Sequence, residues 1–349
     1  MPKVRPRGEE IRRFITENVG RHPADISKIT AVHFQITRQA VNKHLHMLLA
    51  GQKLAVTGNT RNRSYELLRQ VDRAQQYPIN DALAEDIVWT KDIAPLLGQQ
   101  PENVLDIWQY GFTEMFNNAK DHSEGSEIIV GVTKTAFSAK MYVKDNGVGI
   151  FRKIQMAMNL ADERHAVLEL SKGKLTTDSK HHTGEGIFFS SRMFDDFMIY
   201  SGNLAFSHRL GDEENWLLEG SRFLSGTTVW MELRNSTPRT VKEIFDQYAS
   251  GKDFDFSKTV VPLKLAQYGN DKLISRSQAK RVLARVELFT AAVFDFTGID
   301  TIGQAFADEI FRVFPSQHPG VEIIPTNASP DIERMIKRVK PGEAGPAHE

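Results

Sequence analysis

The chain has 349 residues, its 44 Lys and Arg are balanced by 44 Asp and Glu, and it contains no cysteine. The lack of cysteine excludes disulfides and thiolate metal ligands, and the length predicts two or three domains. No apolar run reaches the length of a membrane span, and the N-terminus lacks the apolar core of a signal peptide. We therefore expect a cytoplasmic protein without a membrane partner.

Charge is distributed unevenly along the chain. Residues 1–70 hold 13 Lys and Arg against 5 Asp and Glu, a balance of +8, so the remaining residues carry −8. A basic end on an otherwise acidic protein favours an anionic partner such as nucleic acid, although a merely solvated basic face gives the same count.

The apolar pattern predicts an α+β multidomain protein with three domains at residues 8–70, 80–238 and 254–339. A Pro/Gly/Ala-rich stretch at 340–349 is typical of a flexible tail.

The first block predicts three helices and a hairpin. Apolar residues recur at helical spacing in three sets: Ile11, Phe14, Ile15 and Val19; Ile26, Ile29 and Val32; and Ala40, Val41, Leu45, Leu48 and Leu49. Thr37 is the expected N-cap of the third helix. Residues 53–56 and 64–68 alternate like two strands around a turn-prone segment at 58–62. This layout resembles a winged helix-turn-helix domain.

The resemblance implies DNA binding through the third helix and the hairpin tip. The residues expected at DNA are Arg38, Gln39, Asn42 and Lys43 on the helix, and Arg61 and Arg63 on the tip. Such side chains donate to base edges and phosphates. Winged helices also dock on proteins, in which case these side chains are ordinary polar surface.

A predicted helix over residues 107–122 carries Glu114 and Asn118 one turn apart, so both side chains lie on one face. A carboxylate can orient a water and an amide oxygen can ligate Mg²⁺. Such a pair occurs by chance in many helices.

Two alternating runs, at 128–132 and 139–143, predict strands that lead into Asp145-Asn146-Gly147-Val148-Gly149. A buried Asp after a strand can accept a hydrogen bond from an adenine amino group, and glycines let a ring approach the backbone. An ordinary Asn-Gly turn is the alternative.

Gly184 and Gly186 open a further helical pattern, where free amides suit a phosphate. The polar residues 151–182 before them are interpreted as a mobile lid over the phosphates or as a plain charged loop. The segment contains Lys172, Lys174, Lys180, His181 and His182, of which Lys172 and Lys174 are candidate phosphate contacts.

The order Glu-x-x-x-Asn-Ala-x-x-His, Asp-x-Gly-x-Gly, polar segment and Gly-x-Gly resembles the N, G1 and G2 boxes of the GHKL ATPase superfamily. Gly226-Thr227 resembles the superfamily's closing threonine segment. The resemblance covers roughly residues 80–238 and implies a Bergerat-type α/β sandwich that binds ATP with Mg²⁺.

Roles follow residue by residue from this resemblance. It implies that Glu114 polarises the attacking water or hydroxyl and that Asn118 holds Mg²⁺. It implies that Asp145 recognises adenine, with Gly147 and Gly149 lining the base and Thr227 supporting Asp145, while Gly184 and Gly186 contact phosphates. His182 stands where many members have another glycine, and Glu185 adds negative charge beside the phosphates, which puts turnover in doubt.

The third block alternates helices and strands, as expected for a small α/β domain. Helices are predicted at 273–283, 303–313 and 330–339, and strands at 291–296 and 321–324. The stretch Phe294 to Gly303 resembles STAS-like domains, which implies contacts with a protein partner. Thr301 stands where STAS antagonists are phosphorylated and is a candidate phosphoacceptor, unless it only N-caps the following helix.

The leading interpretation is an ATP-binding, DNA-binding regulator, in which ATP changes DNA affinity by favouring one domain arrangement. An anti-sigma-type serine/threonine kinase is the runner-up, and a conformational ATPase resembling Hsp90 or MutL is third. A sensor histidine kinase is least favoured, because the upstream histidines all lie in the first block. A homodimer is expected by analogy only.

Overall fold

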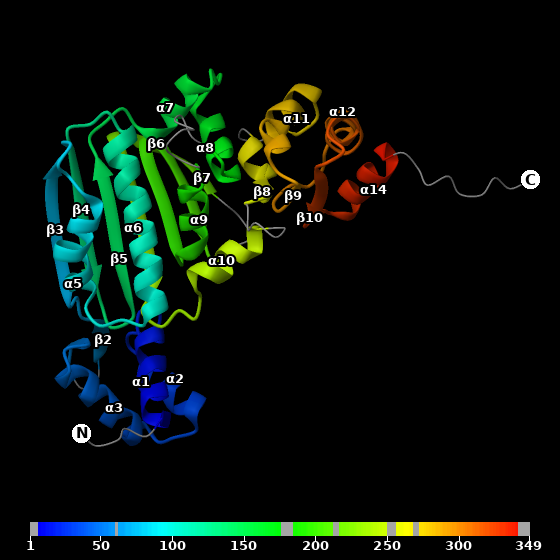
Figure 1. The fold of residues 1–349 in the computed structure, drawn as a ribbon. Coiled ribbons are helices and arrows are strands. Elements are labelled where there is room, and N and C mark those ends of the chain that lie inside the picture. The colour runs from blue at the N-terminus through cyan, green and yellow to red at the C-terminus, as the bar shows by residue number, and fades with distance from the viewer. Residues whose placement is uncertain are drawn as a thin grey trace, which may run out of the picture.

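The structure is a computed structural model that describes residues 6–59, 62–175, 184–211, 216–249, 256–267 and 272–340. Three parts follow one another along the chain (Figure 1): a helical N-terminal part, a middle part with a five-stranded sheet, and a C-terminal part with a three-stranded sheet. This arrangement agrees with the expected α+β multidomain class. No helix in the described ranges is both long and apolar enough to cross a lipid bilayer.

The N-terminal part has a hydrophobic core of its own, to which Ile15, Val41 and Leu45 contribute. Its elements are α1 (Pro6–Asn18), α2 (Ile26–Phe34), α3 (Arg38–Ala50) and the antiparallel strands β1 (Leu54–Thr57) and β2 (Ser64–Leu67). Val32 was expected inside but is 72% exposed. The short helix α2 buries the face that carries Ile26 and Thr30, and Val32 lies on the opposite side.

Thr37 is confirmed as the N-cap of α3. Its Oγ1 accepts a hydrogen bond from the amide of Ala40 at 3.2 Å, which satisfies one of the unpaired amides of the first turn. The start of α3 is therefore fixed by its own sequence.

Only residues 68–70 separate β2 from β3 (Val71–Pro78), so the N-terminal part joins the middle part directly. The strand β3 pairs along its whole length with β4 (Glu127–Lys134). An ion pair between Arg69 and Asp72 (2.9 Å) and a hydrogen bond from the Gln70 amide to the Lys134 carbonyl (2.8 Å) fix the junction. The sheet thus begins before the boundary expected at residue 80. The sequence pattern did not predict β3, because this strand buries only Tyr77 and lacks an apolar alternation.

The middle part is built on an antiparallel sheet in the order β3-β4-β5-β7-β6. It adds β5 (Ser138–Asp145), β6 (Asp196–Arg209) and β7 (Trp216–Arg234). The helices α6 (Glu102–His122) and α9 (Gly186–Met193) cover one face (Figure 1), where α6 buries Trp108, Phe112 and Phe116. Three short helical segments precede α6: α4 (Glu85–Val88), η1 (Trp89–Ile93) and α5 (Ala94–Leu97).

Residues 151–175, the described part of the polar segment 151–182, are not the loop that their polarity suggested. The described part of this segment forms α7 (Ile150–Ala157) and α8 (Glu163–Lys172). Asp162 caps α8, because its side chain accepts a hydrogen bond from the Arg164 amide at 2.8 Å. The second half of α8, from Ala166 to Lys172, is buried on every side, so its sequence shows no one-sided apolar period that would predict a helix.

The C-terminal part has a parallel sheet in the order β10-β9-β8. Its strands are β8 (Lys258–Pro262), β9 (Ala291–Asp295) and β10 (Glu322–Thr326), and its helices are η2 (Leu263–Ala266), α11 (Arg276–Leu283), η3 (Val286–Leu288), α12 (Gln304–Asp308), η4 (Glu309–Val313), α13 (Phe314–Gln317) and α14 (Pro330–Val339). Neither β8 nor α10 (Val241–Tyr248), which leads into this part, was predicted from the sequence pattern.

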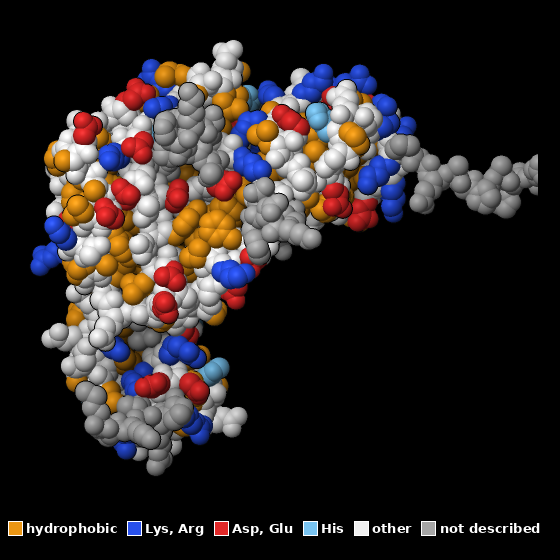
Figure 2. All heavy atoms as spheres, in the orientation of Figure 1, with side chains coloured by type: hydrophobic (Ala, Val, Ile, Leu, Met, Phe, Trp, Pro, Cys, Tyr) orange, Lys and Arg blue, Asp and Glu red, His pale blue; other side chains and the backbone are white. Residues whose placement is uncertain are grey.

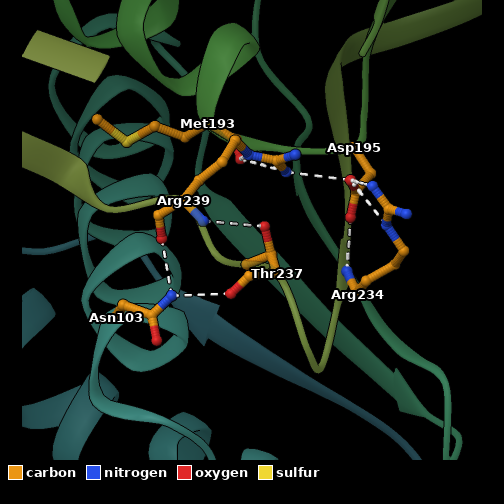
Figure 3. A network of polar contacts seen from close by, with 6 residues as sticks. All are labelled: Asn103, Met193, Asp195, Arg234, Thr237 and Arg239. Carbon is orange, nitrogen blue, oxygen red and sulfur yellow. Dashed lines mark hydrogen bonds and ion pairs between the residues drawn. The ribbon is translucent and has the colours of Figure 1, made fainter. Parts of the chain in front are cut away.

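A network of polar contacts closes the end of the middle part from which α10 departs (Figure 3). Arg239 donates to the Met193 carbonyl (3.0 Å) and to Asp195 (3.1 Å), and Arg234 donates to the same carboxylate. Asn103, near the start of α6, donates to the Thr237 and Arg239 carbonyls. The entry of α10 is thus fixed to α6 and to the end of α9.

One hydrophobic core runs through both the middle and the C-terminal parts. Side chains of α6 and α9 belong to the same contact cluster as Phe294 and Phe306 of the C-terminal part. Burial of apolar surface stabilises by about 25 cal/mol per Å², so these two parts share their main source of stability.

Candidate functional site

A cavity of about 280 Å³ lies between α6, α7, α8, α9 and the strands β5 and β7. Seven residues singled out in the sequence line it: Glu114, Asn118, Asp145, Gly149, Gly184, Gly186 and Thr227. They come from four separate stretches of the chain, and the fold brings them to one place. A cavity of this size with convergent polar groups is typical of a small-molecule site.

The helix α6 presents Glu114 and Asn118 to the cavity from consecutive turns. The Glu114 carboxylate lies directly against Gly186, the first residue of α9, so closely that a Cβ added to Gly186 would overlap it. The catalytic candidate therefore lies against the N-terminus of the helix that opens with Gly186.

Asp145 ends β5 and is 5% exposed. Its Oδ1 accepts hydrogen bonds from the amides of Gly147 (2.9 Å) and Thr227 (3.1 Å). Burial raises the pKa of this carboxyl, and the hydrogen bonds to it act in the opposite direction. Gly147 does not line the cavity itself, and its amide orients the carboxylate that does.

Two glycines allow the backbone to close around Asp145. Gly226 has φ +73°, and a Cβ there would overlap the Asp145 carbonyl. Gly149 has φ +95°, and a Cβ there would lie 2.5 Å from Ser201 Oγ. Both positions need the left-handed region and the missing side chain.

Thr227 connects the two glycine turns. Its amide donates to Asp145, and its Oγ1 accepts from the Ile150 amide at 3.0 Å. Ser201 donates to the Gly226 carbonyl at 3.1 Å and holds the neighbouring peptide. Thr227 of β7 therefore holds the carboxylate directly, and the start of α7 and Ser201 of β6 hold Thr227 and its neighbour Gly226.

Gly184 and Gly186, at and just before the start of α9, line the cavity, and Glu185, the N-cap, makes no side-chain capping bond. Backbone amides at a helix N-terminus bind anions. Nearby, burial and then the carboxylates of Glu114 and Glu185 raise the pKa of Tyr110, so this end of the cavity also carries negative charge.

Lys153 lines the cavity and was missed in the sequence. Its Nζ donates to the His122 carbonyl at the end of α6 (2.6 Å) and to Glu124 (2.9 Å). A cation at a helix C-terminus is favourable. The available signal was its position one turn into the helix that follows Gly149.

Lys172 and Lys174 are not phosphate contacts in this structure. Lys172 has a fully buried side chain, and its Nζ donates to Glu169 (2.7 Å) and to the Ala284 carbonyl (2.8 Å). Lys174 donates to the Leu288 carbonyl (3.1 Å). Lys180, His181 and His182 lie outside the described residues.

On α3, Arg38, Gln39, Asn42 and Lys43 are all exposed, as is Arg63 beside β2. Arg61 lies outside the described residues. Figure 2 shows acidic side chains over the face of the middle part that carries α6, where Glu102, Asp106 and Asp121 are exposed.

Thr301 is exposed and does not cap a helix. The N-cap of α12 is Gly303, without a side-chain hydrogen bond, so the capping interpretation of Thr301 is wrong. The neighbouring Ile302 forms a bridge with Leu273 instead.

No group of three or more metal-binding side chains occurs among the residues that the structure describes. A divalent cation at Asn118 therefore requires further oxygen ligands from a bound molecule or from water, which is the usual situation for Mg²⁺ with phosphates.

Comparison with known proteins gives one family match. Residues 278–333 match the model of a STAS-like domain of unknown function (DUF4325). No curated protein matches the chain. The match runs from α11 into α14, so the C-terminal part contains a STAS-like domain, as its sequence predicted.

Proposed function

We propose that this protein is an ATP-responsive DNA-binding regulator, in which the middle part binds Mg-ATP as a GHKL domain and the N-terminal part binds DNA as a winged helix. The observation that carries the proposal is the convergence of Glu114, Asn118, Asp145 and the glycine segments on one cavity. These residues belong to three motifs that lie up to 72 positions apart in the chain, and their convergence on one cavity supports a common ligand.

In this proposal Asp145 accepts a hydrogen bond from the adenine amino group. Its orientation by two backbone amides supports this role, because a fixed acceptor discriminates between bases better than a mobile one. Gly149 and Ile150 lie beside the base, and the amides at the start of α9 receive the phosphates.

Mg²⁺ has two tasks in this proposal. Asn118 supplies one oxygen, and the phosphates and water supply the rest. The ion also offsets the carboxylates of Glu114 and Glu185, which otherwise repel phosphates. Binding of ATP is therefore expected to depend strongly on Mg²⁺.

For DNA, the order α1-α2-α3-β1-β2 supports a winged helix with α3 as the recognition helix. The exposed Arg38, Gln39 and Asn42 carry donors suited to base edges.

A serine/threonine kinase is the second candidate, because a STAS-like domain with an exposed Thr301 belongs to the same chain as the nucleotide cavity. Glu114 would then polarise a hydroxyl instead of a water. Incubation with labelled ATP separates the functions: label on Thr301 favours the kinase, and released phosphate alone favours a conformational ATPase of the Hsp90 or MutL type. Retained ATP affinity without either leaves the regulator.

The test is calorimetric titration of the full chain with Mg-ATP. Asn118→Ala is expected to lower the affinity at least tenfold, because the metal loses its protein ligand. Asn117→Ala, on the same helix but outside the cavity lining, is the matched control and should bind as the unaltered chain does. Equal affinity in Asn118→Ala and the unaltered chain would remove the proposed nucleotide site.

A further inference from the structure

The C-terminal end of α8 is held by the C-terminal part of the protein. Lys172 extends out of the helix, and its Nζ donates to the Ala284 carbonyl (2.8 Å) and to the carboxylate of Glu169 in the same turn (2.7 Å). Thr259 of β8 donates to the Lys172 carbonyl at 2.6 Å. All three of Glu169, Lys172 and Thr259 are buried.

Arg285 completes the attachment from the other side. Its guanidinium donates to Glu169 Oε2 (3.2 Å), to the Glu169 carbonyl (3.3 Å) and to the Gly173 carbonyl (2.7 Å). The last carbonyls of a helix have no partner within the helix. In α8 two of them, the carbonyls of Lys172 and Glu169, accept hydrogen bonds from Thr259 and Arg285 of the C-terminal part.

The helix α9 is fixed to the same part by aromatic contacts. Phe256, next to β8, lies with its ring centroid 4.5 Å from that of Phe188 and 4.9 Å from that of Phe189. Phe289, before β9, packs on Phe256 at 5.3 Å. Aromatic pairs at these distances contribute beyond the area that they bury.

The two helices held in this way form one wall of the proposed nucleotide cavity. Leu170 of α8 and Leu175 just after it line the cavity on either side of Lys172. Gly186 and Ile187 of α9 line it directly before Phe188. None of the described residues of the C-terminal part lines the cavity, yet that part holds two of the elements that shape it.

We infer that the STAS-like domain of this chain is an internal effector of the nucleotide site, and that Arg285 is a positioning residue that holds α8 in its binding geometry. The inference rests on the proposed function. When α8 and α9 are already held in place, binding of nucleotide loses less conformational entropy in ordering them. Attachment of the domain therefore raises nucleotide affinity. Because coupling is reciprocal, bound nucleotide strengthens the attachment of the domain to the same extent.

The test uses Arg285→Asn in the full chain. Residue 285 has φ +64°, which asparagine tolerates, so the substitution removes the guanidinium without new backbone strain. The expected result is a loss of Mg-ATP affinity of about tenfold, within the 5–150-fold range usual for coupled sites. Arg285→Lys retains one cationic donor and should recover part of the affinity. Arg276→Asn removes an exposed arginine of the same domain and should change nothing.

A second measurement needs no variant. Hydrogen exchange of the unaltered chain should slow over residues 276–289 when Mg-ATP is added, because nucleotide and domain attachment stabilise each other. A purely structural role of Arg285 predicts no such slowing, since these residues lie outside the cavity lining.

The outcomes separate the two claims. Tight binding to the unaltered chain, with equal affinity in Arg285→Asn and no protection of residues 276–289, overturns this inference and leaves the proposed nucleotide function intact. Protection without a loss of affinity in Arg285→Asn supports the coupling but removes Arg285 from it. Failure of the unaltered chain to bind ATP overturns both.

Discussion

At the scale of single residues, Asp145 is a buried carboxylate that the fold stabilises only in part. Two backbone amides bind its Oδ1, yet the net effect of its surroundings raises its pKa. An ionised group in such a place costs stability. Residues of this kind are retained at functional sites, where their charge or acceptor capacity serves a ligand.

Asp145→Asn is expected to separate stability from function. The folded carboxyl holds its proton more tightly than the unfolded one, so its ionisation destabilises the fold as pH rises above the ordinary value of 3.8. The asparagine Oδ1 can accept the same two amides without charge. At neutral pH the free variant should therefore unfold at an equal or higher temperature than the unaltered chain, with the difference disappearing in acid.

The same variant should lose the stabilisation by Mg-ATP, because an amide nitrogen cannot accept the adenine amino group. Thermal unfolding across pH, with and without Mg-ATP, measures both effects. A marked drop in stability of the free variant at neutral pH would contradict the assignment of Asp145 as a strained functional group.

At the scale of elements, α3 combines a buried face with an exposed polar row. Val41, Leu45 and Leu48 are buried, while Arg38 and Asn42, one turn apart, are exposed. The Thr37 cap fixes where the helix begins and therefore which residues face outward. A recognition helix needs this combination of a rigid base and free donors.

Substitution on α3 should affect DNA binding without unfolding the protein. Asn42→Ala is expected to weaken binding to a preferred sequence by about 1–3 kcal/mol, because a base-edge contact is lost. Lys43→Ala should lower the affinity for all sequences and reduce its salt dependence. Fluorescence anisotropy at two salt concentrations measures both, with Lys91→Ala on the exposed surface of η1 as the control. If all three variants bind alike, α3 is a protein-docking surface or plain solvated surface.

At the scale of the whole molecule, contacts run from one end of the chain to the other. The three residues between β2 and β3, with the Arg69–Asp72 pair, fasten the N-terminal part to the edge of the sheet. The sheet carries the cavity, and α8 and α9 fasten the cavity wall to the STAS-like domain. A change of arrangement at the cavity therefore has a continuous physical route to both ends.

ATP and DNA are accordingly expected to change each other's affinity by the same factor, since linkage is reciprocal. Paired titrations measure this: calorimetry of Mg-ATP with and without DNA, and anisotropy of DNA with and without Mg-ATP. Unequal factors would indicate an unrecognised third equilibrium. Tight ATP binding with no effect on DNA would separate the two activities and favour the kinase or the ATPase.

Much of the local structure follows from periodicity in the sequence. The alternation in β4 and β5, the one-turn spacing of Glu114 and Asn118, and the amphipathic α14 all appear where their patterns predicted them. Each depends on contacts within a few residues, which a local pattern encodes. The STAS-like domain could be identified in the same way, from one short stretch and an alternation of elements.

Only the tertiary structure decided the parts that depend on distant partners. The polar segment β3 forms a strand because its backbone pairs with the edge of β4. The charged segment α8 forms a helix in whose last turn two carbonyls accept hydrogen bonds from another domain. Lys172, expected at a phosphate, is buried against a carbonyl 112 residues away. Sequence alone determined which residues form each motif. Tertiary packing decided which of them meet, because a hydrogen bond across such a separation leaves no periodic trace in the chain.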